Sequence, residues 1–560
     1  MTLLEAGPAA GPVPLPPDFP VAFAPGDEQL LWDRDRTHFP SQVTTLEAEF
    51  VSEAVADGMA HALRQYGAPV GGVKVRAING YVYQAMLPPD VPPDALEELA
   101  RRADEQILTA IGRLPDRWEE EWLPEIMGHL VAMQALTPRR AALHTLLDHL
   151  EEHRARLERL WQIHFEIVLP AYLAVSEFEE LYRELFAGEQ FDAYRLLHGF
   201  QSKTFEVGRD LWRLSRIALA APDVAHVLEA EAAAGVIPRL ESIPAAHAFL
   251  TELRRHLAAY GHRTATWGLA SPTFIEDPAP VITVIKDYIG RPDSADPGCE
   301  LERLAREREV AVAEARERLR GYPAAVVQQF EAMLGAAQVG LVLTEDHGFY
   351  IDAWGVSLAR ELLSEIGGRL VADGTLDEAD DVLMLTYDEL RMVGLEPVDH
   401  RRLIADRRAA LAPYASVAPP PLVGTLPPGP PPDGPMTRLA AKFAGAPAAS
   451  TEPGVVTGTA GSGGTATGVA RVVRSLEDAA RLKPGDVLVA ETTAPSWTPL
   501  FAVACAVVTD TGGILSHCAV VAREYAIPAV VGTADGTVAI ADGDLIEVDG
   551  DAGTVRVLVC

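Results

Sequence analysis

Apolar residues recur at helical spacing from Pro93 to about Arg408. Between Leu143 and Trp161 they stand three, four or seven positions apart, with Glu, Arg and His on the other positions. Such spacing gives an α-helix one buried face, and Thr137-Pro138 fits its start as N-cap and first-turn proline. Several helices joined by short loops form a bundle, and further helical runs cover residues 178–185, 193–219, 245–260, 280–288, 300–321, 323–334 and 350–366.

A different pattern precedes this region. Apolar residues alternate with polar ones on both sides of Asn79-Gly80, and both residues of this pair tolerate the positive φ angles of a type I′ turn. The pattern predicts a small β-hairpin. Residues 46–66 are predicted to form a helix, and the proline-rich residues 1–24 a flexible N-terminal arm.

The composition changes sharply in the last third of the chain. Residues 413–464 are rich first in proline and then in glycine, alanine and serine, which predicts a linker. After it, short β-branched runs alternate with glycine turns. The predicted fold class is therefore multidomain, α and α/β. It comprises a large, mainly helical domain over residues 25–412, with the small hairpin near its N-terminus, and a small C-terminal β/α domain over residues 465–560.

The net charge of −33 argues against a nucleic-acid or anionic-membrane partner, because a strongly acidic surface repels both. The four cysteines have neither metal-type spacing nor the arrangement of a disulfide framework, which fits a reducing cytosol. The N-terminus lacks the basic and apolar regions of a signal peptide. We therefore expect a cytoplasmic protein without a membrane partner.

One histidine stands where the local sequence favours an anion. A short strand is predicted over Ala506–Thr509, a turn at Gly512-Gly513, and a helix from Ser516 to Tyr525, which puts His517 in the first helical turn. Amides there lack intrahelical partners and the helix dipole is positive, which attracts an anion and keeps the imidazole neutral and nucleophilic. A surface or capping role is the ordinary alternative for a histidine at a helix start.

The whole string from Thr509 to Gly532 closely resembles the phosphohistidine segment of the swivelling mobile domain in PEP-utilising enzymes. Phosphoenolpyruvate synthase, pyruvate phosphate dikinase and rifampin phosphotransferase share that domain. The histidine that follows Gly-Gly-x-x-Ser/Thr/Cys carries the phosphoryl group in this family, and His517 matches it. The resemblance covers about the last hundred residues, including Gly468-Val-Ala-Arg-Val-Val, Lys483-Pro-Gly-Asp-Val-Leu and Trp497-Thr-Pro-Leu-Phe.

This resemblance implies roles for the neighbours of His517. Arg523 and Thr511 are the candidates to hold the phosphoryl oxygens, and Gly512 and Gly513 would let the backbone approach the anion. Ser516 would cap the helix.

The helical region contains four polar clusters, at residues 201–206, 260–263, 274–278 and 344–352. Each has an ordinary explanation when taken singly. Lys203 with Glu206 fits a surface ion pair, and His262-Arg263 fits a helix end. Glu345-Asp346-His347 fits either metal ligands or a solvated acidic turn.

Taken together, the clusters resemble the central region of rifampin phosphotransferase-like proteins and the larger subunit of phenylphosphate synthase. This resemblance implies a binding domain for the hydroxyl compound that accepts the phosphoryl group. The candidate acceptor-binding residues are His262, Arg263, Glu345, Asp346, His347 and Lys203, and no metal is assigned to the site. His262 and His347 are the candidate bases, and Arg263 would balance the phosphoryl charge.

A phosphoryl-donor site is not recognisable in the sequence. There is no Gly-x-x-x-x-Gly-Lys-Ser/Thr loop, and an ATP-grasp domain does not fit ahead of Trp32. We therefore expect a separate ATP-grasp nucleotide-binding protein to phosphorylate His517 from ATP, with Mg²⁺ at that donor step. The domain would swing on residues 413–464 and pass the group to a small phenol or alcohol.

Two other interpretations remain open at this stage. The chain could be a non-catalytic phosphohistidine carrier or regulatory protein whose helical domain binds a partner. It could also be a subunit of a phosphotransferase that inactivates a rifamycin-type antibiotic. A deep, apolar acceptor pocket would favour an enzyme over a carrier.

Overall fold

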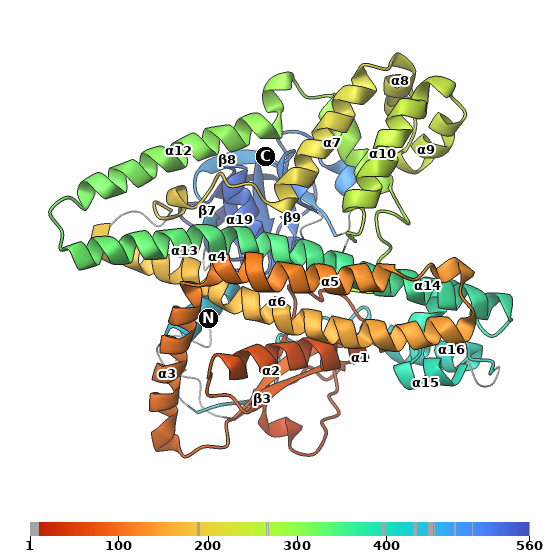
Figure 1. Ribbon diagram of the computed structural model, residues 1–560, viewed down its shortest axis with the longest axis horizontal. Helices are drawn as coiled ribbons and strands as arrows, with labels where there is room; N and C mark the ends of the chain where they lie inside the picture. The colour runs from red at the N-terminus through yellow and green to blue at the C-terminus, as the bar shows by residue number, and fades with distance from the viewer. Residues whose placement is uncertain are drawn as a thin grey trace.

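Long helices form the centre of the computed structural model (Figure 1). It describes residues 11–558 except 187–190, 265, 267, 394–397, 429–433, 446–451, 453, 475–477 and 495–496. Helix α6 (Leu143–Phe186) lies side by side with α13 (Ala324–Gly348), which continues through a π-helical segment, η8 (Phe349–Gly355), into α14 (Val356–Ala372). The apolar faces of these helices supply a large part of the main hydrophobic core.

The start of α6 differs from the prediction. Thr137-Pro138 opens only a short 3₁₀ turn, η4 (Pro138–Arg140), and Thr137 makes no capping hydrogen bond. Helix α6 begins at Leu143 and runs on past Pro170, so it unites two helices that the sequence predicts separately. Its buried face continues through Leu173 and Phe178, and this continuous burial explains why the helix does not break.

The stretch Ala324–Ala372 is long and apolar enough to cross a membrane by length and composition alone. A core helix of a globular protein meets the same criteria. Phe330, Leu334 and Ile366 on this stretch are almost fully buried in the main core. A single stretch of this kind is weak evidence for a membrane span.

The remaining helices of this region surround α6 or form a separate lobe with its own core (Figure 1). Around the long helices lie α1 (Thr45–Phe50), η2 (Val51–Val55), α2 (Ala56–Gln65), α3 (Pro93–Ile111), α4 (Leu114–Arg117), η3 (Trp118–Trp122), α5 (Leu123–Gln134), η5 (Tyr194–Leu196), α12 (Pro297–Arg318), η9 (Ala379–Met384), α15 (Tyr387–Val393) and α16 (Arg401–Leu411). The lobe comprises α7 (Lys203–Leu219), α8 (Pro222–Ala230), α9 (Ala233–Glu241), α10 (His247–Tyr260) and α11 (Ala279–Ile289). We call all of this the helical body.

A five-stranded sheet of order β1-β5-β2-β4-β3 belongs to the helical body. Its strands are β1 (Gly11–Pro12), β2 (Leu31–Arg34), β3 (Gly72–Ile78), β4 (Tyr81–Leu87) and β5 (Leu422–Leu426). The predicted hairpin is confirmed, because β3 and β4 pair antiparallel around Asn79 and Gly80, whose φ angles are 51° and 88°.

Two boundary predictions need correction. The N-terminal arm is not free over its described part, because β1 pairs with β5 and Phe19 is fully buried beside Trp32. The predicted linker 413–464 is largely folded where it is described. It contains β5, helix α17 (Pro435–Ala444), which packs on α6, and two strands of the C-terminal domain. Residues 429–433, 446–451 and 453 of that linker lie outside the described residues.

The C-terminal domain is built on an eight-stranded sheet of order β6-β13-β12-β8-β9-β10-β11-β7. The strands are β6 (Val455–Thr457), β7 (Thr459–Ser462), β8 (Thr465–Val472), β9 (Val487–Ala490), β10 (Ala506–Thr509), β11 (Ala529–Val531), β12 (Leu545–Asp549) and β13 (Thr554–Val557). Strands β8 to β11 run parallel. Short helices α18 (Thr498–Phe501), α19 (His517–Glu524) and α20 (Gly536–Ala539) accompany the sheet. Because β6 and β7 pair into the sheet, the domain begins near Val455 and not at residue 465.

The close approach of α6 and α13 depends on a glycine. A Cβ atom added at Gly340 would stand 2.7 Å from the backbone oxygen of Ala171, which cannot move without displacing α6. We expect Gly340→Val to lower the free energy of unfolding of the helical body by about 1–3 kcal/mol through overpacking.

Gly335 on the same helix is the matched control, since an added Cβ there meets nothing within 4 Å. Gly335→Val should change the stability by no more than about 0.5 kcal/mol, as at other surface positions. Calorimetric melting of both variants measures the difference, and equal effects would contradict the role of Gly340.

Candidate active site between α19 and α13

The loop before α19 fixes the position of His517. Strand β10 ends at Thr509, and Gly512 turns the chain with a φ of 92°, a conformation that favours glycine. Ser516 is the N-cap of α19, and its hydroxyl accepts a hydrogen bond from the backbone N–H of Ala519 at 3.4 Å. His517 is therefore the first residue of the helix.

The imidazole of His517 lies between the C-terminal domain and the helical body, with 13% of its side-chain surface exposed. Its Nδ1 lies 3.4 Å from the hydroxyl of Thr493. Its Nε2 is buried, finds no hydrogen-bond partner among the described residues, and lies 4.0 Å from Oε2 of Glu345 on α13. Burial, followed by the positive charge of Arg263, lowers the pKa of His517 to about 3. The ring is therefore neutral near pH 7, and its Nε2 faces the helical body.

Glu345 belongs to a chain of buried hydrogen bonds. Thr204 at the start of α7 donates from its hydroxyl to Oε2 of Glu345 at 2.9 Å, and Arg263 donates to the same hydroxyl at 3.3 Å. Because the Thr204 oxygen accepts from Arg263, its proton is directed at Glu345. Burial is the main cause that raises the pKa of Glu345 to about 7. A carboxyl group with such a pKa can exchange a proton near neutral pH.

Aromatic rings and two cations surround this chain. Phe349 and Tyr350 of η8 have ring centroids 5.1 Å apart, and the ammonium of Lys203 lies 6.0 and 5.9 Å from the two centroids. Arg263 lies over Phe349 at 5.7 Å. Lys203 also pairs with Glu206 at 2.7 Å, and its backbone N–H donates to Asp346 at 2.7 Å. These contacts place Lys203, Arg263, Glu345 and Asp346 in one cluster, from which Glu345 approaches His517.

The two histidines predicted as bases are engaged elsewhere. Nδ1 of His262 lies 3.0 Å from the hydroxyl of Ser357, and its ring stacks on Trp354 at 5.1 Å. Nδ1 of His347 lies 2.6 Å from the backbone oxygen of Leu343. Burial lowers the pKa of both histidines to about 4. The group that faces His517 is the carboxyl of Glu345, so the expectation of a histidine base needs correction.

The segment 345–347 is not a solvated acidic turn. Glu345 and His347 are buried within α13, with 8% and 5% of their surfaces exposed. Asp346 accepts the hydrogen bond from Lys203 described above. Neighbouring residues of a helix point in different directions, so Glu345, Asp346 and His347 contact different parts of the structure.

Arg523 and Thr511 do not point at His517. Arg523 donates to the backbone oxygens of Gly461 and Ile514 at 2.7 and 2.9 Å, and it lies over the ring of Tyr194 at 4.1 Å. Thr511 donates from its hydroxyl to the backbone oxygen of Glu491 at 3.1 Å. In this arrangement both residues hold the loop and its contact with the helical body, in place of the expected phosphoryl contacts.

The glycine pair has a packing role as well. A Cβ atom at Gly513 would stand 2.2 Å from the backbone oxygen of Lys442, so the loop before α19 lies directly against α17. The backbone N–H of Leu515 donates to the same oxygen at 3.3 Å. Gly512 supplies the positive φ angle, and Gly513 permits the close approach.

Sequence reasoning missed two hydroxyl groups of this site, on Thr204 and Thr493. Thr204 lies inside the polar cluster 201–206, where the charged Lys203 and Glu206 dominated the interpretation. Thr493 follows β9, a parallel strand, and ligands commonly bind beyond the carboxyl ends of such strands. This position after a parallel strand could have identified Thr493 as a candidate site residue.

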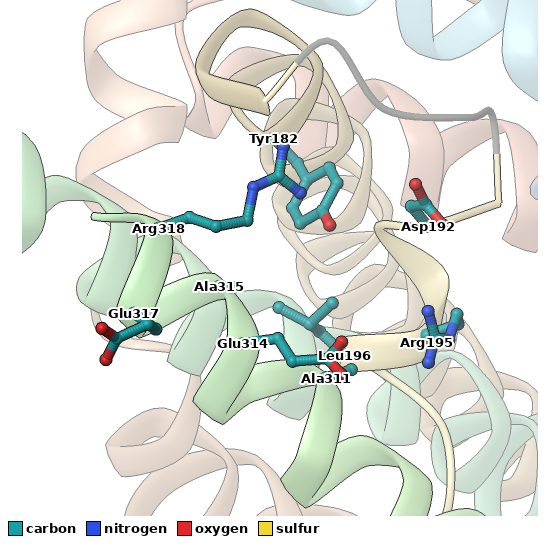
Figure 2. A pocket seen from close by; sticks show the side chains of 9 residues that line it. All are labelled: Tyr182, Asp192, Arg195, Leu196, Ala311, Glu314, Ala315, Glu317 and Arg318. Atoms are coloured by element: carbon teal, nitrogen blue, oxygen red, sulfur yellow. The ribbon is translucent and has the colours of Figure 1, made fainter. Parts of the chain in front are cut away.

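A cavity of about 390 Å³ lies away from His517 (Figure 2). It is formed where the end of α6 meets η5 and α12, and its lining mixes both charges with apolar side chains. The lining residues are Tyr182, Asp192, Arg195, Leu196, Ala311, Glu314, Ala315, Glu317 and Arg318. None of the predicted site residues belongs to it.

The two regions of the chain that meet at His517 each match a known protein family. Residues 482–553 match the family model of the PEP-utilising enzyme mobile domain, and residues 164–345 match the fourth domain of rifampicin phosphotransferase. The chain carries a PEP-utilising mobile domain. His517 lies in this mobile domain, whereas Thr204, Arg263 and Glu345 lie in the region that matches the fourth domain. We use "mobile domain" below for the C-terminal domain from Val455 onward.

Three relatives illustrate the similarity. The chain is 39% identical over 571 residues to chondramide synthase cmdD of Chondromyces crocatus, covering 99% of this chain. It is 28% identical to the uncharacterised phosphotransferase YvkC of Bacillus subtilis over 95% of this chain. It is 30% identical to a rifampicin phosphotransferase of a Streptomyces species over 63% of this chain. The chain spans only 14%, 62% and 40% of the lengths of these three proteins.

Apolar side chains hold the mobile domain against the helical body. Ile514, Leu515 and Val520 are buried, and they belong to the main core of the body instead of the two cores of the mobile domain. Lys442 on α17 also pairs with Glu179 and Glu180 of α6, at 3.0 and 2.9 Å, beneath the loop. We call the packing of Ile514, Leu515 and Val520 into the core of the helical body the docking contact.

We expect Leu515→Asp to release the mobile domain without unfolding it. Burial of a leucine contributes about 1.5–3 kcal/mol, so loss of this contact should raise the undocked population at least about tenfold. Small-angle scattering and protease accessibility of the loop report the change. Val538→Asp is the matched control in the same domain, because Val538 is 85% exposed. A compact Leu515→Asp variant would contradict the docking contact.

Docking should also weaken as the pH rises. Burial is the main cause that raises the pKa values of Glu345, Asp346 and Glu524 to about 7, 6 and 8. Repulsion from neighbouring carboxylates adds to each shift, and for Asp346 that neighbour is Glu206. After undocking, these carboxyls would meet water and regain their ordinary lower pKa values. The docked form therefore binds more protons, and its advantage is lost as the pH rises through about 6 to 8.

Scattering measured from pH 6 to 9 tests this expectation. The undocked fraction of the wild type should increase over that range, and Glu524→Gln, which cannot ionise, should reduce the slope. A docked fraction that increases with pH would contradict the assignment of these carboxyls.

Proposed function

We propose that this chain is the phosphotransferase component of a dikinase-type system. In this proposal His517 carries a phosphoryl group and transfers it to the hydroxyl of a small organic acceptor bound against the helical body. The observation that carries the proposal is the buried, neutral Nε2 of His517, 4.0 Å from the carboxylate of Glu345. Nδ1 is next to Thr493, so Nε2 is the nitrogen that would bear the group.

The proposed transfer needs one attack and one proton transfer. The acceptor oxygen attacks phosphorus, the P–N bond breaks, and its electron pair returns to Nε2 of His517. The hydroxyl proton passes to Oε2 of Glu345, whose pKa of about 7 suits a base at neutral pH. The buried guanidinium of Arg263 would offset the charge on the phosphoryl oxygens.

The surroundings favour an aromatic acceptor. Phe349, Tyr350 and Trp354 form an aromatic group next to Arg263 and Lys203. Aromatic rings pack well against a phenol, and the two cations would stabilise a developing phenolate or phosphate. A phenol or a similar alcohol is therefore the proposed acceptor class.

A second acceptor class is a rifamycin-type antibiotic. The observation that favours it is the match of residues 164–345 to the fourth domain of rifampicin phosphotransferase. A panel with simple phenols and rifamycins separates the two classes. Under the third interpretation, a non-catalytic carrier, no acceptor would be phosphorylated in either arm.

We propose ATP as the phosphoryl source, delivered with Mg²⁺ by an ATP-grasp nucleotide-binding protein. A gap of 4.0 Å between Nε2 and Glu345 leaves no room for a phosphoryl group. Loading of His517 would therefore take place with the mobile domain away from α13, and transfer would need the domain to stand back far enough to admit the phosphoryl group and the acceptor. Strand β5 and helix α17 pack on the helical body, and therefore the pivot of such a swing would lie beyond Ala444.

Phosphorylation and transfer can be tested separately. Labelled ATP with the ATP-grasp protein, or phosphoramidate as a small-molecule donor, should place an acid-labile label on the wild type and none on His517→Ala. Glu345→Gln should accept the label but transfer it to a phenol about 10²- to 10⁴-fold more slowly, because the base is lost.

His262→Gln is the control for a histidine base and should transfer the label at a rate close to that of the wild type. Label on His517→Ala would refute the carrier role. Transfer by Glu345→Gln at the wild-type rate would refute the base.

A further inference from the structure

Two histidines and an aspartate meet inside the helical body, apart from the proposed transfer site. His347 lies two residues after Glu345 on α13. Residues two apart on an α-helix point about 200° apart, so His347 is directed away from His517. The residues it meets are Asp352 of η8 and His164 of α6, and all three are buried.

The π-helical segment brings His347 and Asp352 together. In a regular α-helix, residues five apart are about 140° apart around the axis. Helix α13 passes into the π segment Phe349–Gly355, where each turn holds more residues, and the Asp352 carboxylate returns to the side of His347. Nε2 of His347 lies 3.9 Å from Oδ2 of Asp352. Such π turns are uncommon and frequently occur at functional sites.

His164 completes the group from the neighbouring long helix. Its Nδ1 lies 2.7 Å from Oδ1 of Asp352, and its ring meets that of His347 edge to face at 4.6 Å. One ligand-type atom from each of the three residues lies within 4.8 Å of the others. We call these residues the His-His-Asp cluster.

The ring of His347 is oriented as in a metal ligand. The backbone oxygen of Leu343 can only accept, so Nδ1 of His347 carries the proton and Nε2 has a free lone pair. Histidines that bind metals typically donate their second ring N–H to a carbonyl or carboxylate in this way.

The short gap within the cluster also favours a cation. Nε2 of His347 and Oδ2 of Asp352 both present electron pairs, and 3.9 Å is too long for a direct hydrogen bond between them. Two such atoms facing each other in a buried place repel one another. A cation between them would convert that repulsion into two bonds.

We propose that the His-His-Asp cluster binds a divalent first-row transition metal of the Zn²⁺ class. Two imidazoles and one carboxylate suit zinc, cobalt or iron(II), whereas Mg²⁺ and Ca²⁺ prefer ligand sets of oxygen alone. Metal–ligand bonds of about 2.0–2.2 Å require the three side chains to close in by roughly 1 Å. Three protein ligands leave a coordination position open for water or another oxygen ligand.

The site is separate from the donor-step Mg²⁺ and does not depend on phosphoryl transfer. It adds a bond between α6 and the α13–η8 junction, directly behind the segment that presents Phe349 and Tyr350. Metal binding and phosphorylation of His517 can therefore be measured independently on the same preparation.

Cobalt spectroscopy on the full, untagged chain tests the proposal. After treatment with a chelator, titration with Co²⁺ should give ligand-field absorption that saturates at one equivalent, and Zn²⁺ should abolish it whereas Mg²⁺ should not. An absence of saturable absorption in the wild type would overturn the proposal without any variant.

Variants then identify the ligands. Each of the substitutions His347→Gln, His164→Gln and Asp352→Asn should weaken Zn²⁺ binding by more than the roughly 10- to 100-fold loss that follows removal of a residue that only hydrogen-bonds to a metal ligand. His262→Gln is the matched control, because it is a buried histidine of the same body outside the cluster. Unchanged binding by His347→Gln and Asp352→Asn would show that metal binds elsewhere and would overturn the assignment. Circular dichroism confirms that each variant is folded.

Discussion

The close contact between α6 and α13 is the constraint on which both proposed sites depend. Gly340 lets the two helices approach until the backbone of α6 at Ala171 limits the distance. Across this contact α6 supplies His164, and α13 supplies Glu345 and His347. A one-ångström displacement of either helix would separate His164 from Asp352. The long helices therefore act as a rigid frame that holds side chains from distant parts of the sequence in fixed positions.

The site at His517 is formed by side chains from two domains. The mobile domain supplies the imidazole and the hydroxyl of Thr493, and the helical body supplies Glu345 with the Thr204–Arg263 pair. The Nε2 atom of His517 and the carboxyl of Glu345 are buried where the two domains meet, and burial is the main cause of both shifted pKa values. Removal of water from this interface therefore underlies both the shifted pKa values at the site and the expected pH dependence of docking.

Local signals in the sequence predicted the local parts of this structure. The Asn79-Gly80 hairpin, the strand before Asp510 and the helix start at Ser516 each follow from a few neighbouring residues, and all three are confirmed. The pairing of β5 with β2 was not predictable, since it joins residues that are far apart in the chain. The roles of Arg523 and His347 were missed for a related reason. Their partners, Tyr194 and Asp352 with His164, become neighbours only through tertiary packing.

The order of strands in the five-stranded sheet has a consequence for how the chain folds. Strand β5 comes after all the helices of the body, yet it lies between β1 and β2, which come before them. The long loop closed by this pairing costs entropy that grows only slowly with its length, but the ends can meet only when the helices between them are compact. We therefore expect the sheet to be completed after the bundle has formed. Its last strand leads through α17 to the mobile domain, which is attached to a body whose two ends are already joined.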